Sequence, residues 1–125
     1  MIFLDTHVAV WLYKGDLGLI PEAVQRELDE HPLVISPMVT LELQYLHEVG
    51  RITVGGAEIV SELSSTIGLT ADDLSLGEII GGALCADWTR DPFDRLIVAH
   101  AELRRAALAS KDAAILAQYG RAFWG

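Results

Sequence analysis

The sequence has 125 residues, 51% of them hydrophobic and 22% charged, which is typical of one globular domain and excludes a disordered chain. Its 18 acidic and 9 basic residues give a net charge of −9, which argues against charge-driven coating of nucleic acid. The single cysteine, Cys85, excludes a disulfide scaffold, and its apolar surroundings predict a small core residue.

The charge is distributed unevenly along the chain. Residues 1–89 hold three basic and fourteen acidic side chains, whereas residues 90–125 hold six basic and four acidic ones. The balance is therefore −11 in the first segment and +2 in the second. Such asymmetry marks either a binding face or helices that carry solvated arginines, and composition alone leaves both open.

The chain predicts an alternation of short apolar strands and helices. Strands are expected over residues 2–4, 33–35, 69–74, 108–110 and, at a sheet edge, 122–124. Helices are expected over residues 7–13, 21–29, 36–49, 55–67, 76–88, 92–107 and 113–119.

This alternation predicts the α/β class, with a parallel sheet covered by helices on both faces and one domain over residues 1–125. In such folds the ligand binds beyond the carboxyl ends of the strands. The polar residues expected at that edge are Asp5, Thr6, Ser36, Lys111 and Asp112.

Helix capping explains several acids when each is taken alone. Asp91 precedes Pro92, and Asp94 follows at the third helical position, which is typical of a capped helix start. Ser36 before Pro37 repeats the pattern. Asp5 and Asp112, which follow the strands predicted over residues 2–4 and 108–110, are also suited to capping the next helix. Each cap contributes about 1 kcal/mol of stability. Capping can therefore explain the presence of each of these residues without a catalytic role.

Capping does not explain the acids as a set. Glu42 falls six residues beyond Ser36, outside any capping position. Together with Asp5, Asp94 and Asp112 it would place four carboxylates at one edge, where they repel each other unless a cation lies between them. Carboxylates without a His or Cys cluster favour Mg²⁺ or Mn²⁺ over Zn²⁺, and such ions suit phosphoryl chemistry.

Four segments resemble PIN-domain ribonucleases, and most closely the VapC-type toxins of bacterial toxin–antitoxin pairs. They read LDTH, SPMVTLEL, DPFDRLIVAHA and SKDAAI, of which the third is the most specific, and the resemblance covers essentially the whole chain. It implies a three-layer α/β/α fold with a central, mainly parallel sheet. It also implies Mg²⁺- or Mn²⁺-dependent endoribonuclease activity, an RNA substrate and a cognate VapB-like antitoxin.

Matched position by position, the resemblance implies that Asp5, Glu42 and Asp94 are the three most characteristic acids. Asp112 matches a fourth, more variable acid, and Asp91 an additional metal ligand. All but Asp91 are expected to act in catalysis, in which a metal-activated water attacks phosphorus in line. Glu42 or Asp112 would orient that water or accept its proton.

Four further residues are expected around the acids. Thr6 and Ser36 match small polar positions of the family near the metal. Arg95 and Lys111 flank the acids in sequence, so they would either contact substrate phosphates or form surface ion pairs with the acids.

The predicted helix over residues 36–49 has too many apolar positions for an ordinary surface helix. These are Leu41, Leu43, Tyr45, Leu46 and Val49. An exposed apolar strip there would mark a homodimer contact or the antitoxin-docking surface. Trp11 and Tyr13 of the first helix are interpreted as core or interface residues rather than as a base-stacking platform.

Two alternatives remain at this stage. A receiver-like phosphoacceptor domain has a similar length and sheet, but here the first strand ends in a single acid, Asp5, and the second in Ser36. A PIN-like module that binds without cleaving would have no need to retain four repelling carboxylates. No segment suggests a membrane span or a targeting signal, so a cytoplasmic location is expected.

Overall fold

The computed structural model describes all residues 1–125. Five parallel strands form one sheet in the order β3-β2-β1-β4-β5. The strands are β1 (Ile2–Leu4), β2 (Leu33–Ile35), β3 (Thr70–Ala71), β4 (Ala107–Ala109) and β5 (Ala122–Phe123). The predicted α/β class is confirmed, and the sheet is wholly parallel.

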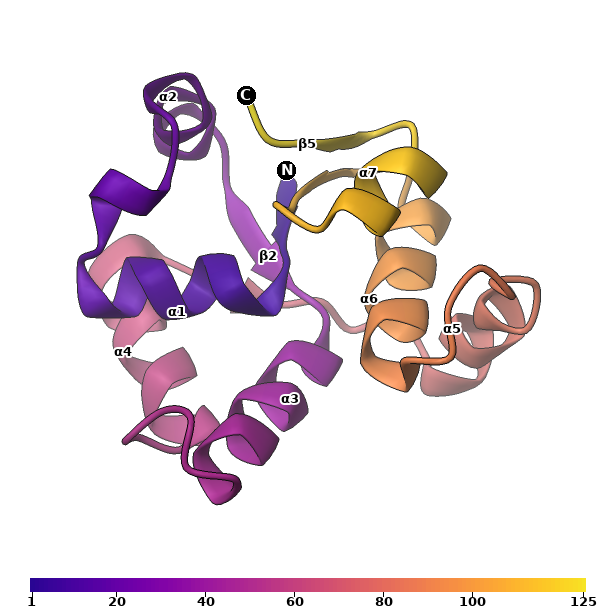
Figure 1. Ribbon diagram of the computed structural model, residues 1–125, viewed down its shortest axis with the longest axis horizontal. Coiled ribbons are helices and arrows are strands. Elements are labelled where there is room, and N and C mark those ends of the chain that lie inside the picture. Colours follow the sequence, from indigo (N-terminus) through magenta and orange to yellow (C-terminus); the bar gives the residue numbers. More distant parts are fainter.

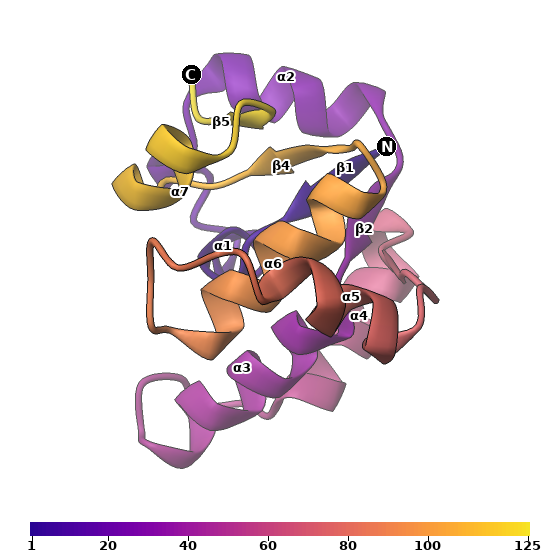
Figure 2. The ribbon, with the colours of Figure 1, turned by 90° about the vertical axis from the view of Figure 1, so that its right-hand side faces the viewer.

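Helices cover both faces of this sheet, which confirms the three-layer architecture. Figure 1 shows α1, α2 and α4 on one side of β1 and β2, and α5, α6 and α7 on the other, and Figure 2 shows the second layer face-on. The seven α-helices are α1 (Thr6–Lys14), α2 (Glu22–Glu30), α3 (Pro37–Glu48), α4 (Gly56–Ile67), α5 (Leu76–Ala83), α6 (Pro92–Leu103) and α7 (Ala113–Gln118). None of them has the length and hydropathy that a membrane span requires.

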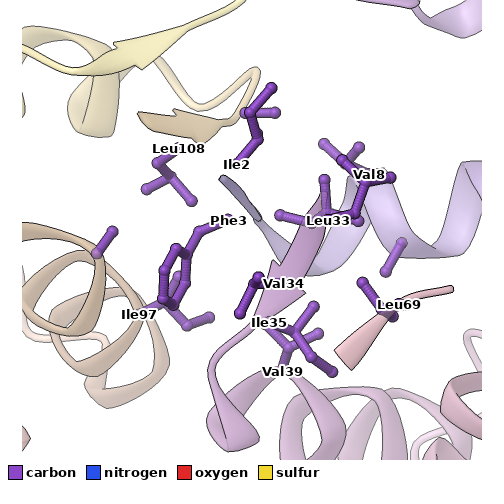
Figure 3. Close-up of a cluster of buried hydrophobic side chains, with 14 of the residues drawn as sticks. Ile2, Phe3, Val8, Leu33, Val34, Ile35, Val39, Leu69, Ile97 and Leu108 are labelled. Carbon is purple, nitrogen blue, oxygen red and sulfur yellow. The ribbon is translucent and has the colours of Figure 1, made fainter. Parts of the chain in front are cut away.

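The central strands are apolar throughout because both of their faces are buried. Phe3 of β1 lies beside Ile97 of α6, whereas Leu33 of β2 lies on the opposite side of the sheet, near Val8 of α1 (Figure 3). Phe3, Val8 and Ile97 have no exposed surface. Full burial of such a side chain stabilises the fold by about 1.5–3 kcal/mol. This burial fixes the positions of the central strands and of the residues that directly follow each strand.

Four helices begin with the predicted polar caps. The side chains of Asp5, Ser36, Asp91 and Asp112 each accept a hydrogen bond from a backbone N–H in the first turn of their own helix. Asp5, Ser36 and Asp112 also follow the ends of β1, β2 and β4 closely, so the capping groups lie at the carboxyl edge of the sheet.

The predicted helix over residues 76–88 is too long, because α5 ends at Ala83. The guanidinium of Arg95 donates hydrogen bonds to the carbonyls of Ala83 and Leu84, which satisfies the end of the helix. Cys85 therefore lies beyond the helix and is exposed. The prediction that it is a core residue is wrong, because the apolar run continues past the point where the helix stops.

The third strand is shorter than predicted, because it covers Thr70–Ala71 rather than residues 69–74. Two further differences concern helix ends. The helix expected over residues 92–107 ends at Leu103, two residues before Arg105 adopts a positive φ of 52° and turns the chain into β4. An unpredicted 3-10 turn, η1 (Leu17–Leu19), joins α1 to α2. Both differences arise at helix ends, where the hydrophobic period gives no information.

One buried polar pair ties α6 to the end of β3. His100 has no exposed surface, and its Nε2–H donates to Asp72 Oδ2 at 2.7 Å. Arg104 Nε donates to the same oxygen at 2.8 Å. Burial alone would raise the pKa of Asp72, but the hydrogen bonds from His100 and Arg104 outweigh it and hold that pKa below its usual value.

Replacing Asp72 should therefore destabilise the fold. Asp72→Ala leaves the Nε2–H of His100 buried without an acceptor, which costs about 1–3 kcal/mol of the free energy of unfolding. Asp73→Ala is the matched control, because the side chain of Asp73 is 99% exposed, and its change should stay within about 0.5 kcal/mol. Urea denaturation measures both, and equal midpoints for the two variants would show that the pair contributes nothing.

Candidate active site

Asp5 is the most enclosed of the predicted site acids, with 3% of its surface exposed. Its Oδ1 accepts a hydrogen bond from the backbone N–H of Thr6 at 2.8 Å. Its Oδ2 accepts one from the hydroxyl of Ser110 at 2.7 Å. These donors hold a buried carboxylate in one orientation at the end of the central strand.

Ser110 joins two acids of the site and was not among the predicted residues. The same hydroxyl that donates to Asp5 accepts a hydrogen bond from the backbone N–H of Asp112 at 3.1 Å. Ser110 follows β4 directly, as Ser36 follows β2. That position was the available signal, but the predicted strand included Ser110 and so concealed it.

Glu42 approaches Asp5 from α3 and is linked to it through Thr6. The hydroxyl of the buried Thr6 donates to Glu42 Oε1, while its backbone N–H donates to Asp5. Burial raises the pKa of Glu42, and the charges of Asp5 and Asp91 raise it further, whereas the hydrogen bond from Thr6 opposes the rise. Thr6, predicted to lie near the metal, is the residue that orients both carboxylates.

Asp94 lies in the first turn of α6, close enough to every other predicted acid for their charges to affect its pKa. Burial raises its pKa, and the carboxylates of Asp91, Asp5, Asp112 and Glu42 raise it further, to about 7. Its carboxyl group forms no hydrogen bond or ion pair within the chain. The structure therefore brings all five predicted acids into one electrostatic neighbourhood.

The acids suit a hard divalent cation by their chemistry but do not converge on one point in this arrangement. No three His, Cys, Asp or Glu side chains are close enough together to bind one ion. Asp91 and Asp112 each use only Oδ1 for capping, so each keeps Oδ2 as a possible ligand atom. By donor chemistry, five carboxylate side chains suit Mg²⁺ or Mn²⁺ better than Zn²⁺.

His7 is a second residue of this edge that was not predicted. Its Nδ1 lies 3.5 Å from Asp5 Oδ2, and its Nε2 accepts a hydrogen bond from the backbone N–H of Lys111 at 3.0 Å. Burial lowers the pKa of His7, although the charges of Asp5 and Asp112 oppose this. The acceptor role of Nε2 assigns the proton to Nδ1, which faces Asp5.

The remaining predicted residues occupy different places. Ser36 is fully buried and caps α3 through Met38, which fixes the start of the helix that carries Glu42. Arg95 is engaged with the end of α5 and forms no ion pair with the acids. Lys111 is exposed, and its Nζ lies 5.9 Å from the centroid of the Trp11 ring.

Comparisons with known proteins identify a matching family model and similar folds. The family model of the PIN domain matches residues 2–121. Among curated protein sequences none matches the chain.

Three solved structures share the fold over nearly their whole lengths. A toxin–antitoxin complex from Klebsiella pneumoniae is 17% identical, with a TM-score of 0.67 and coverage of 98% of this chain and 96% of its own. VapBC2 from Rickettsia felis, bound to a promoter DNA fragment, is 19% identical, with a TM-score of 0.63 and coverage of 98% and 96%. DNA-bound VapBC from Salmonella typhimurium is 17% identical, with a TM-score of 0.59 and coverage of 97% and 93%. At these identities the likeness concerns the fold.

Removing the charge of Asp94 should stabilise the metal-free protein at neutral and alkaline pH. The carboxyl ionises near 3.8 when unfolded and at about 7 when folded, so rising pH ionises the unfolded chain first. The free energy of unfolding of the wild type therefore falls between about pH 4 and pH 7 and stays lower above that range. The free energy of unfolding of Asp94→Asn should not fall in this way, because asparagine does not ionise.

Thermal unfolding in EDTA measures the difference. After allowance for solvent screening of the partly exposed carboxyl, we expect Asp94→Asn to be more stable by about 1–2 kcal/mol at pH 8. For a chain of 125 residues that corresponds to a Tm higher by about 4 °C for each kcal/mol, and the gap should close toward pH 4. Asp29→Asn, an exposed position near the end of α2, is the control. A difference in Tm between Asp94→Asn and the wild type that does not change with pH would contradict the raised pKa of Asp94 in the folded protein.

Proposed function

This chain belongs to the PIN-domain family, and from that premise we propose that it is a metal-dependent endoribonuclease of the VapC type. It would hydrolyse RNA phosphodiester bonds and be neutralised by a cognate VapB-like antitoxin. Because such a toxin acts on the RNA of its own cell, the proposal includes a cytoplasmic location. Membership in the PIN-domain family rules out the alternative of a receiver-like phosphoacceptor domain.

The grouping of five carboxylates in one electrostatic neighbourhood, at the carboxyl edge of the sheet, carries this proposal. Burial raises the pKa of Asp94, and repulsion from the other four carboxylates raises it further, to about 7. Capping alone does not require Glu42 or Asp94 to be acidic. Asp5 and Asp94 would bind the ion directly, and Glu42, Asp91 and Asp112 directly or through water. Bound Mg²⁺ or Mn²⁺ would supply charge neutralisation and an activated water.

The chain's own residues divide the remaining work. Thr6 and Ser110 hold Asp5 at a fixed orientation, so this carboxylate is positioned before any substrate arrives. Glu42 receives the Thr6 hydroxyl on Oε1, which leaves Oε2 to orient a water or accept its proton. The raised pKa of Glu42 makes it a better base near neutral pH than an exposed glutamate.

The proposed antitoxin requires an accessible protein surface, and α3 offers one. Leu41, Tyr45 and Val49 are 55%, 51% and 50% exposed, as the apolar pattern of this helix predicted, whereas Leu43 is buried in the core. We assign this apolar strip to protein contact, with the antitoxin or with a second copy of the chain. The toxin–antitoxin complexes with the same fold support the first of these.

The central test is cleavage of RNA by Asp5→Asn. Asparagine still accepts a hydrogen bond from the Thr6 N–H, and the Ser110 hydroxyl can turn to accept from its amide, so the fold should persist. Loss of the charged ligand should reduce cleavage in Mg²⁺ or Mn²⁺ by about 100-fold or more. Total RNA incubated with each protein, followed by sequencing of the fragment ends, measures this. The family resemblance implies 5′-phosphate and 3′-hydroxyl ends.

Two controls define the result. Asp29→Asn, at the opposite edge of the sheet, should cleave as the wild type does. EDTA should abolish cleavage by the wild type, and added Mn²⁺ should restore it. Metal-dependent cleavage by Asp5→Asn at the wild-type rate would exclude this carboxylate from the mechanism, and cleavage that persists in EDTA would exclude the metal.

A further inference from the structure

Three aromatic rings lie together beside the acid site, and a lysine lies over one of them. We call these four residues the tryptophan cluster: His7, Trp11, Trp124 and Lys111. The centroids of His7 and Trp11 are 5.0 Å apart, and those of Trp11 and Trp124 are 5.7 Å apart. His7 and Trp124 meet edge to face at 6.2 Å. The residues come from the start of α1, the segment after β5 and the turn before α7.

The cluster shares residues with the acid site. His7, Trp11, Lys111 and Asp112 line a shallow depression of about 350 Å³. Asp112 is one of the five site acids, and His7 Nδ1 lies 3.5 Å from Asp5 Oδ2. A polymer whose phosphate reaches the acids would therefore pass a neighbouring nucleotide over these rings.

The rings are only partly buried. Trp11 and Trp124 pack against the core but keep exposed surface, and the side chain of His7 is 32% exposed. Packing against the core therefore covers only part of each ring, and Trp11 also lines the depression beside the acids. The Nζ of Lys111, 5.9 Å from the Trp11 centroid, places a cation on this face in a chain with a net charge of −9.

An aromatic face next to a cation has the chemistry to bind a nucleotide, because the base stacks on the ring and the ammonium contacts a phosphate. We propose that the tryptophan cluster is a stacking platform for the base next to the scissile phosphate of single-stranded RNA. A duplex keeps its bases stacked within the helix, so an unpaired base is required. This inference rests on the proposed function and gives Trp11 a role beyond the core or protein-interface role expected from the sequence.

Paired oligonucleotides test the platform. One is a short single-stranded RNA that contains a mapped cleavage site, and the others carry an abasic nucleotide immediately before or after that site. For the wild type, one abasic position should lower kcat/KM by about 5- to 150-fold, the range for loss of one stacked base. In Trp11→Leu the intact and abasic RNAs should be cleaved equally, since the platform is already absent.

Matched variants guard against a folding defect. Trp124→Leu should reduce the abasic effect in the same way, and circular dichroism and Tm report whether either variant is folded. Trp88→Leu, a partly buried tryptophan beside the α5–α6 cavity, should keep the full wild-type difference. An abasic penalty that is the same in the wild type, Trp11→Leu and Trp124→Leu would overturn the platform. If these variants instead lose antitoxin binding alone, the cluster is a protein interface and the proposal is wrong.

Failure of the proposed function gives a different pattern. If the wild type cleaves neither RNA with added Mg²⁺ or Mn²⁺, the nuclease proposal fails, and fluorescence anisotropy of the same oligonucleotides in Mg²⁺ still tests the platform. Tighter binding of intact than of abasic RNA by the wild type, lost in Trp11→Leu, supports stacking. Equal affinity for both RNAs overturns it.

Discussion

Repulsion between carboxylates at one edge of the sheet is the constraint on which the site depends. Every strand is parallel, so the residues that follow β1 and β4 emerge on the same side, and the turns of α3 and α6 that carry Glu42 and Asp94 reach the same place. The apolar triplets of the central strands supply the burial that keeps these charges together. The stability of the core thus permits a cluster of acids whose mutual repulsion would otherwise drive its residues apart.

The net charge acquires a more specific meaning in this light. The five grouped acids lie at one edge of the sheet, whereas the Nζ of Lys111, next to Asp112 in sequence, lies over the ring of Trp11. Under the proposed function, RNA would meet little general attraction, so its binding would depend on a cation held by the acids and on contacts with individual nucleotides. Such a surface would favour selective cleavage over indiscriminate degradation.

Much of the fold and the acid set could be predicted because each depends on local pattern. Apolar triplets mark buried strands, and Asp or Ser before a helix marks both a cap and the end of a strand. Ser110 and His7 could not be assigned, because their roles arise from partners that are 105 and 104 residues away in sequence. The exposure of Cys85 depends on where α5 ends, and a tertiary contact from Arg95 satisfies that end.

Three helices begin at the acid site, since Asp5, Asp91 and Asp112 cap α1, α6 and α7. The first turn of a helix carries partial positive charge, which eases the repulsion among the acids but also weakens their hold on a lone cation. The same turns attract an anion. The acid site would therefore be best satisfied by a cation and a phosphate together, so metal and substrate should reinforce each other's binding. For the proposed nuclease, selectivity for a metal-bound phosphodiester would then follow from how the helices start.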